Sequence, residues 1–235
     1  KLEFTLSLLE TTSPSYIIMA HLDIARAIME SSGEENINRV LEGVEILSGA
    51  LLENGVFRIL SVDDINIGEI DRTRVVINVR NTGKTGFEIE KVLRNQYNIQ
   101  VEMSDLYNVV CITTVADTLE DIMRLQRAFL HMAQCLKNEG TQRNLERELE
   151  IDGLNIPEQR MELAAVMHRG FVKRKLSDAV GFVSRAMITP YPPGIPVVCP
   201  GEVISKDIAE YVMRVIEAGG AVNGVSSSLE VDVID

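Results

Sequence analysis

Two segments of the chain carry residue types whose spacing suits the binding of a charged ligand. Thr11, Thr12 and Ser13 stand before Pro14 at a predicted helix start, where hydroxyls, unpaired amides and the helix dipole together suit a phosphate. The stretch Thr189–Glu202, TPYPPGIPVVCPGE, is stiffened by prolines and ends in one acid, and such a loop can hold a recognising carboxylate steady. A plain N-cap and a structural strap with a solvated carboxylate are the alternatives.

A third segment, Gly83-Lys84-Thr85, lies between a predicted strand and a predicted helix, as a phosphate-binding P-loop does. A P-loop needs the pattern G-x-x-x-x-G-K-S/T so that successive amides surround the phosphates, and Asn78 stands where the first glycine should be. We therefore expect a tight turn with Thr85 as the N-cap of the following helix. A P-loop nucleotide binder is the alternative.

The cysteines and histidines predict neither a disulfide framework nor a metal site. Cys111, Cys135 and Cys199 are odd in number and far apart in the sequence, which fits a reducing cytoplasm. His131 has Cys135 one helical turn away, but two ligands are too few for a metal site. We expect this pair to be ordinary helix residues.

The composition is that of a folded globular protein. Of the 235 residues, 46% are hydrophobic and 25% are charged, and 23 Lys and Arg against 35 Asp and Glu give a net charge of −12. This charge would repel a nucleic-acid backbone, and the apolar runs fall short of the about 20 residues of a membrane-spanning helix. Lys1–Glu10 lacks the apolar core of a signal peptide, and the absence of an initial Met indicates that residue 1 is not the gene's first residue.

Residues 1–54 are expected to be the helical tail of a large domain whose earlier part is absent here. Ser13-Pro14 predicts a helix over 14–29 with the serine as N-cap. A second helix is predicted over 35–53, ended by Asn54-Gly55. Both helices have an apolar face but no sheet of their own to cover.

Two further domains are predicted, a small α+β domain over 55–140 and a C-terminal domain over 141–235. The first has strands expected at 57–62, 74–80, 99–103 and 108–114 and helices expected at 86–96 and 119–136. The second follows a charge-rich connecting segment and has helices expected at 157–168, around 177–185 and at 206–218. Its proline-rich stretch is expected to be a rigid loop, because prolines remove the amide donors that an interior strand or helix needs.

Two blocks, residues 11–26 (TTSPSYIIMAHLDIAR) and 190–202 (PYPPGIPVVCPGE), together resemble signature segments of the bacterial ornithine/lysine/arginine decarboxylases. These enzymes use pyridoxal phosphate on the fold-type-I scaffold. Residues 83–125 are similar to the small α+β domain of that family, so the resemblance covers nearly the whole chain. It implies a mixed α/β and α+β fold that comprises the end of a large domain, a small α+β domain and a C-terminal α+β domain.

The resemblance also implies roles for the residues singled out above. Thr11, with Thr12 and Ser13 close by, would lie at a dimer interface and reach the phosphate of pyridoxal phosphate in the neighbouring subunit. Glu202 would approach the entrance of the site and pair with the distal amine or guanidinium of a basic amino acid. Tyr191 would help to shape that entrance.

The Schiff-base lysine of this family follows a histidine in an S-x-H-K motif, and no lysine of this chain follows a histidine. The chain thus resembles the C-terminal half of such an enzyme; no catalytic residue is expected in it, and it should be inactive alone.

For the whole protein, the resemblance implies pyridoxal-phosphate-dependent decarboxylation of a basic amino acid. Arginine, which would give agmatine, is the preferred substrate, with lysine or ornithine next. The resemblance further implies a cytoplasmic homodimer, or a larger homo-oligomer, in polyamine biosynthesis. A non-catalytic fragment or a regulatory subunit of such an enzyme is the alternative.

Overall fold

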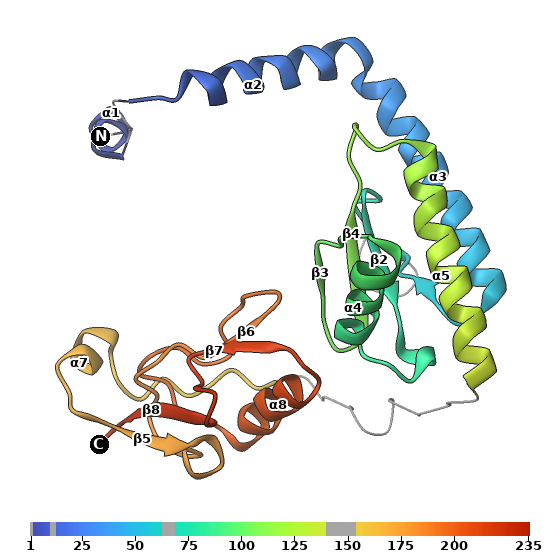
Figure 1. Ribbon diagram of the computed structural model, residues 1–235. Coiled ribbons are helices and arrows are strands. Elements are labelled where there is room, and N and C mark those ends of the chain that lie inside the picture. The colour runs from blue at the N-terminus through green and yellow to red at the C-terminus, as the bar shows by residue number, and fades with distance from the viewer. Residues whose placement is uncertain (1, 10–12, 63–68, 140–153) are drawn as a thin grey trace.

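The computed structural model describes residues 2–9, 13–62, 69–139 and 154–235. Figure 1 shows three parts in chain order: a helical arm, an α+β unit in which helices lie beside a four-stranded sheet, and a C-terminal unit with two two-stranded sheets. Within these residues, no helix combines the length and the apolar character that crossing a lipid bilayer requires.

The arm consists of α1 (Leu2–Leu9) and α2 (Tyr16–Ile28), and neither helix buries a side chain. The prediction that Ser13 caps this helix is wrong, because α2 begins two residues later than expected. Ser15 is the N-cap instead, and its Oγ accepts the N–H of Ile18 at 3.4 Å. The serine whose hydroxyl reaches the first turn therefore sets the start of the helix, and this is the serine after the proline, not the one before it.

A π-helix of five residues, Met29–Gly33, joins α2 to α3 (Glu34–Asn54) without a break. The sequence analysis did not predict it. A Cβ on the buried Gly33 would lie 3.0 Å from Cε of Met29, so the flexible methionine side chain packs directly against this glycine. The end of α3 is confirmed as predicted, because Gly55 follows it with a left-handed φ of +75° and returns its N–H to the last turn.

The α+β unit contains a mixed sequence of strands and helices, as predicted. Its elements are β1 (Arg58–Ile59), β2 (Arg74–Asn78), the 3₁₀ turn Arg80–Thr82, α4 (Gly86–Tyr97), β3 (Met103–Ser104), β4 (Asn108–Ile112) and α5 (Leu119–Glu139). The strands form one antiparallel sheet in the order β1-β2-β4-β3. The strand predicted over 99–103 is shifted, since only Met103 of that range lies in β3.

Three helices cover one face of this sheet. Val75 and Ile77 of β2 lie opposite Cys111 and Val109 of β4, and all four side chains are buried. Residues two apart on a strand point to the same face, so these four share one face and join side chains of α3, α4 and α5 in a single core. The alternation of apolar residues that predicted both strands therefore also fixes which face is buried.

The C-terminal unit has its own hydrophobic core between α8 and a pair of strands. Its elements are α7 (Leu163–Met167), β5 (Phe171–Lys175), the 3₁₀ turn Leu176–Asp178, β6 (Thr189–Tyr191), α8 (Lys206–Glu217), β7 (Ala221–Asn223) and β8 (Glu230–Ile234). β5 pairs with β8 and β6 pairs with β7, both antiparallel. Ile208 and Val212 of α8 pack with Val231 and Val233 of β8, and α8 is confirmed where a helix was predicted.

The helix predicted over 157–168 is wrong for its first half, since only Leu163–Met167 is helical. The backbone of the preceding residues is used elsewhere. Gln159 forms an antiparallel bridge with Glu202, and the carbonyl of Glu158 accepts the N–H of Val203 at 2.9 Å. Pairing with a distant segment therefore overrides the local helical pattern.

The helix predicted around 177–185 is also wrong, because only the short 3₁₀ turn Leu176–Asp178 forms there. Val183 bridges Val203, and Ser184 bridges Val233 of β8. These residues extend the sheet pairing of the unit and are thus unavailable to a helix.

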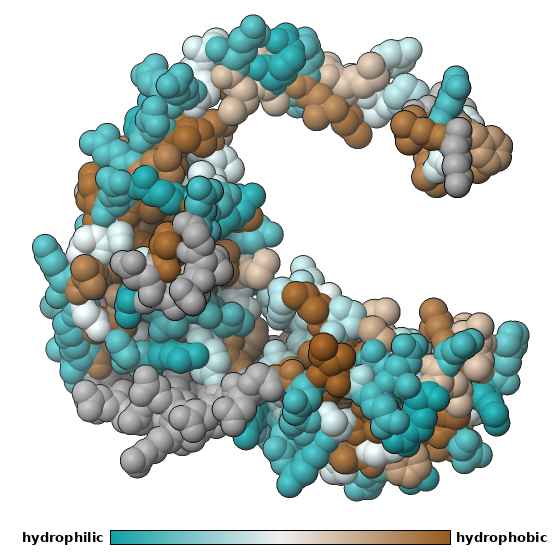
Figure 2. All heavy atoms as spheres, turned by 180° about the vertical axis from the view of Figure 1, so that it is seen from behind, coloured by the Kyte–Doolittle hydropathy of each residue, from teal (hydrophilic) through white to brown (hydrophobic). Residues whose placement is uncertain are grey.

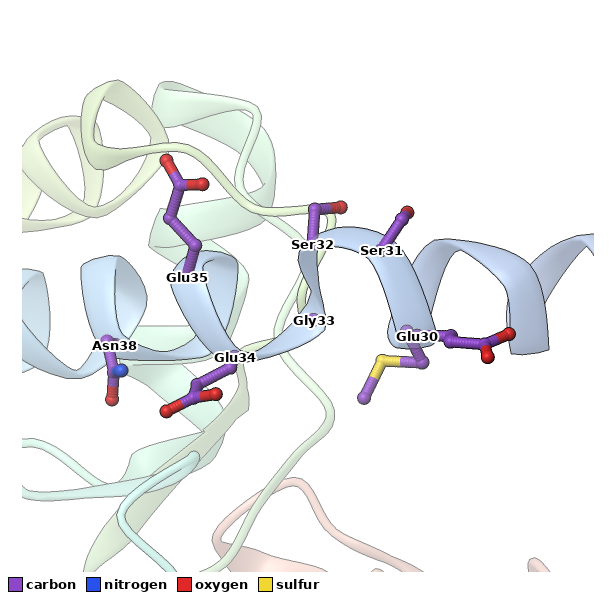
Figure 3. A pocket seen from close by; sticks show the side chains of 8 residues that line it. Glu30, Ser31, Ser32, Gly33, Glu34, Glu35 and Asn38 are labelled. Carbon is purple, nitrogen blue, oxygen red and sulfur yellow. The ribbon is translucent and has the colours of Figure 1, made fainter.

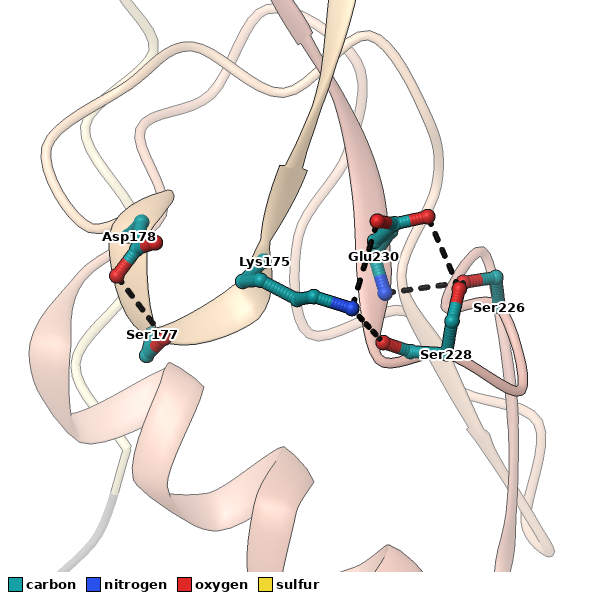
Figure 4. A network of polar contacts seen from close by, with 6 residues as sticks. All are labelled: Lys175, Ser177, Asp178, Ser226, Ser228 and Glu230. Atoms are coloured by element: carbon teal, nitrogen blue, oxygen red, sulfur yellow. Dashed lines mark hydrogen bonds and ion pairs between the residues drawn. The ribbon is translucent and has the colours of Figure 1, made fainter.

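A polar network closes one end of the β5–β8 pair, as Figure 4 shows. Nζ of Lys175 donates to the carbonyl of Ser228 at 2.7 Å and lies 3.4 Å from Oε1 of Glu230. The other carboxylate oxygen of Glu230 accepts the hydroxyl of Ser228 at 2.9 Å. Ser228 and Lys175 lower the pKa of Glu230 by stabilising its ionised form, so the network is anchored on a charged carboxylate.

Adding a methyl group is expected to have opposite effects on the stability of the protein at two glycines, Gly86 of α4 and Gly49 of α3. A Cβ on Gly86 would lie 2.2 Å from the carbonyl oxygen of Asn108 and 2.3 Å from that of Asp105, both backbone atoms. Gly49 lies exposed in α3, with no atom within 4 Å of such a Cβ. We predict that Gly86→Ala destabilises the protein by about 1–3 kcal/mol through overpacking. Gly49→Ala should stabilise it by up to about 1 kcal/mol through helix propensity.

The measurement is urea denaturation of the full-length protein followed by circular dichroism, with both variants beside the wild type. A Gly86→Ala protein as stable as Gly49→Ala would contradict the close approach of α4 to the β3–β4 turn.

Candidate functional site

The predicted phosphate-binding residues precede α2. Thr11 and Thr12 lie outside the described residues, and Ser13 is exposed two residues before the N-cap. The first turn of α2 carries no acidic residue, so the local charge is the positive end of a 13-residue helix. Hydroxyl donors beside such a helix end are a donor set that suits a phosphate.

Exposed apolar side chains run along both helices of the arm. The large apolar side chains exposed on the arm are Leu2, Phe4, Leu6, Leu8, Leu9, Tyr16, Ile17, Ile18, Met19, Leu22, Ile24 and Ile28. Figure 2 shows such residues along the arm, among hydrophilic ones. Soluble proteins rarely leave so large an apolar surface in water, and where they do it commonly marks a contact surface.

The proline-rich stretch forms a closed loop on the C-terminal unit. Ile188 bridges Val198 across its base, and Pro190 lies in β6 opposite Val222 of β7. The expectation of a loop is thus corrected at β6, which is a strand at the edge of a two-stranded sheet, where a missing proline N–H is tolerated. Tyr191 follows in β6 and is 60% exposed, so its ring is available to a ligand or to another surface.

Glu202 lies at the other end of this stretch and is half-buried. Its Oε2 accepts the backbone N–H of Cys199 at 2.6 Å, and its own N–H donates to the carbonyl of Cys199 at 3.1 Å. Its carbonyl accepts the N–H of Ser184 at 2.8 Å. The carboxylate therefore closes a turn, which holds it in one orientation.

Gly201 fixes the position of this turn. Its φ is +95°, and a Cβ on it would lie 2.1 Å from the carbonyl oxygen of Met161. Its carbonyl accepts the N–H groups of Arg160 and Met161 at 2.9 and 3.0 Å. The apolar spacing of the supporting segment predicted a helix there instead. The one signal in the sequence that points to this contact is the glycine before the acid.

The geometry leaves Glu202 able to bind a cation. Among the described residues, Oε1 has no hydrogen-bond partner, whereas Oε2 is held by the turn. Burial, and then the nearby charge of Glu202, raise the pKa of the Cys199 thiol. The neighbouring thiol therefore stays protonated, and the carboxylate is the charged group that this turn presents.

The chain does not bring its candidate residues together into one site. Ser13 belongs to the connection between α1 and α2, whereas Tyr191 and Glu202 belong to the C-terminal unit, and Figure 1 shows the two regions apart. In this arrangement, one small ligand could not place a phosphate at the first region and a cationic group at the second at the same time. The described residues therefore do not form one site that contains both regions.

A pocket of about 460 Å³ lies at the bend around the π-helix, and Figure 3 shows its lining. Glu30, Glu34 and Glu35 are among its residues. The side chains of Glu34 and Glu35 point to opposite sides of the helix in Figure 3, so the carboxylates do not converge on one point. Their charge disfavours a phosphate, and the pocket is not a second candidate for the anion site.

The Gly83-Lys84-Thr85 segment is a turn and a helix cap, as predicted. Gly83 has a left-handed φ of +68°, and Thr85 is the N-cap of α4. Oγ1 of Thr85 accepts the N–H of Glu88, whose carboxylate accepts the N–H of Thr85 at 2.8 Å. The N–H groups of Lys84, Thr85, Gly86 and Glu88 are thus paired within the chain. Nor do any three His, Cys, Asp or Glu of the described residues lie close enough to hold a metal ion.

Comparison with known proteins identifies relatives of most of the chain. Residues 155–230 match the family model described as Orn/Lys/Arg decarboxylase, C-terminal domain. The chain is 32% identical over 224 residues to an arginine decarboxylase of Bacillus anthracis, and 31% identical over 233 residues to one of Bacillus subtilis. These matches cover 93% and 97% of the chain but 44% and 46% of the relatives. The chain thus spans a little under half the length of the curated relatives it matches.

Solved structures share the fold. A lysine decarboxylase of Francisella novicida aligns with 97% of the chain at a TM-score of 0.76, and the constitutive lysine decarboxylase of Escherichia coli aligns with 98% at 0.71. Both are 21% identical in sequence, and the chain covers 44% and 45% of their lengths. The predicted mixed α/β and α+β fold class is therefore confirmed.

The carboxylate of Glu202 accepts a hydrogen bond that closes the turn, and it also carries a negative charge. Two substitutions separate these roles. We predict that Glu202→Ala destabilises the full-length protein by about 1–3 kcal/mol, because it leaves the N–H of Cys199 without its acceptor. Glu202→Gln should cost less than half of that, because an amide oxygen can still accept the same N–H. Thermal unfolding of both variants measures the difference. If the two variants unfold at one temperature, the hydrogen bond to Cys199 does not support the turn.

Proposed function

The chain belongs to the Orn/Lys/Arg decarboxylase family, and from this premise we propose that the protein of which it is part decarboxylates a basic amino acid. Arginine, which would give agmatine, is the first candidate substrate, with lysine and ornithine next. The observation that carries this proposal is the 31–32% identity to arginine decarboxylases over at least 93% of the chain.

Pyridoxal phosphate is the proposed cofactor, and the start of α2 fits its phosphate. Hydroxyls at Thr11, Thr12 and Ser13 beside a helix N-terminus without acidic residues are suitable donors. When bound, pyridoxal phosphate would supply an electron sink for the electron pair left by the departing carboxylate. The part of this chain would be to hold the phosphate and so orient the cofactor. The lysine that binds the cofactor covalently would come from outside this chain.

The three predicted domains remain part of this proposal. Residues 1–54 would be the helical tail of the large cofactor domain, 55–140 the small α+β domain and 141–235 the C-terminal domain. Support for the first comes from the arm, whose apolar side chains are exposed in the described residues. Relatives more than twice as long as this chain would cover that surface with the rest of their large domain or with a second subunit.

Recognition of the basic substrate is assigned to the loop of the C-terminal unit. Oε1 of Glu202 would accept a hydrogen bond from the distal ammonium or guanidinium, and Tyr191 would shape the entrance beside it. A charge-assisted bond of this kind contributes about 1.5–3 kcal/mol. This is enough to favour a cationic substrate over a neutral one of the same shape.

We further propose that the protein acts in polyamine biosynthesis in the cytoplasm, as a homodimer or larger assembly with its site at the subunit interface. The three cysteines are unpaired, which agrees with a reducing compartment. The connection between α1 and α2 lies apart from the C-terminal unit in Figure 1, which agrees with a site completed by another subunit. A non-catalytic fragment or regulatory subunit of such an enzyme is the alternative.

The first test is the reaction itself. We predict that the full-length protein with added pyridoxal phosphate releases carbon dioxide from arginine, and less or none from lysine and ornithine. The measurement is release of labelled carbon dioxide from each amino acid. If the full-length protein releases no carbon dioxide from any of the three amino acids, the enzyme proposal is contradicted and the regulatory alternative is favoured. The present chain alone should be inactive in the same assay.

The second test concerns Glu202. Because Glu202→Gln removes the charge but keeps an acceptor for the turn, we predict that it raises the KM for the basic substrate at least about tenfold, with a smaller change in kcat. Glu210→Gln, which changes an exposed carboxylate of α8 that pairs with Lys206, is the matched control and should leave KM unchanged. An unchanged KM in Glu202→Gln would remove this residue from substrate recognition while leaving the reaction class intact.

A further inference from the structure

A chain of three polar side chains lies on the surface of the α+β unit. The phenol oxygen of Tyr97, at the end of α4, is 2.7 Å from Nδ1 of His131 on α5. Nε2 of the same imidazole is 4.0 Å from Sγ of Cys135, one helical turn further along α5. Both nitrogens of the imidazole thus face a group that can exchange a proton with it.

This arrangement is held by contacts between the end of α4 and side chains of α5. The guanidinium of Arg124 donates to the carbonyls of Tyr97 and Asn98, both at 2.9 Å, and so ties the end of α4 to α5. The rings of Tyr97 and His131 meet edge to face with centroids 6.0 Å apart. Burial raises the pKa of Tyr97, so its phenol stays protonated at neutral pH. In the tautomer in which Nδ1 donates its N–H to the phenol oxygen, the lone pair of Nε2 faces the thiol.

The other two cysteines lack this combination. Cys111 is buried in the sheet, and burial raises its pKa to about 12. Cys199 has a pKa raised by burial and by the charge of Glu202. Cys135 is exposed and faces an imidazole. A nucleophile, a base and a group that orients the base are the parts of an activated thiol.

We propose that Cys135 is a reactive thiol, with His131 as its base and Tyr97 as a positioning residue, and that it takes up low-molecular-weight disulfides and alkylating electrophiles. With a disulfide, the thiol proton passes to Nε2 of His131 as sulfur attacks one sulfur of the reagent. A new S–S bond forms, the S–S bond of the reagent breaks, and the released thiolate takes the proton back. With iodoacetamide, the thiol proton passes to Nε2 of His131 and then to water, an S–C bond replaces the C–I bond, and iodide leaves.

The test is the rate of alkylation in the full-length protein. Iodoacetamide is added at pH about 7, and the labelled peptides are counted by mass spectrometry over time. We predict that Cys135 is labelled first and that His131→Gln slows it about tenfold. An upper limit of about thirtyfold applies, because a free thiol is only a few per cent ionised at this pH. Tyr97→Phe keeps the ring but loses the hydroxyl, and should slow labelling by a smaller factor.

The controls separate activation from folding and from general charge. Near pH 10, where thiols ionise without help, the wild type and His131→Gln should react at the same rate. Lys137→Gln removes a cation two residues from Cys135 and should leave the rate within about twofold. Oxidised glutathione should add to Cys135 in the wild type before either other cysteine. Equal rates in wild type and His131→Gln at pH 7, or earlier labelling of Cys199, would overturn the proposal.

Discussion

The C-terminal unit depends on one close approach of backbone to backbone, at Gly201. The carbonyl of this residue accepts the N–H groups of Arg160 and Met161, while its own N–H donates to the carbonyl of Ser184. Three segments that are distant in sequence therefore meet at a residue without a side chain. A Cβ there would lie 2.1 Å from the carbonyl oxygen of Met161, so any larger residue would drive the segments apart. Since Glu202 is the next residue, the same contact also sets where its carboxylate lies.

The sequence predicted well those elements whose ends depend on local chemistry. Thr85 and Glu88 form the capping box that starts α4, and Gly55 ends α3 in a left-handed turn, because these hydrogen bonds involve residues a few positions apart. The error at α2 was of the same local kind. Ser13 and Ser15 both carry a hydroxyl, and only the geometry shows that the second reaches the N–H of Ile18.

Pairing between segments that are far apart in the sequence does not follow from the local spacing of apolar residues. The spacing of apolar residues over 157–168 fits a helix, yet the bridge between Gln159 and Glu202 pulls the first part of this range into an extended segment. For the candidate site, the motif marked Glu202 as an acid on a stiff loop. It did not show that one of the two oxygens already closes a turn on Cys199, which only the folded loop determines.

In the proposed role of Glu202, the hydrogen bond that its Oε2 already accepts also limits which cationic substrates this residue could distinguish. An ammonium needs one good acceptor, whereas a guanidinium gains most from two parallel hydrogen bonds to both oxygens of a carboxylate. With Oε2 directed at the N–H of Cys199, Glu202 presents mainly Oε1, which serves the two cations about equally well. A fixed carboxylate of this kind would therefore select a cation over a neutral side chain, but it would not separate arginine from lysine. A preference for arginine has to come from groups that contact the other nitrogens of the guanidinium, and those groups lie outside this turn.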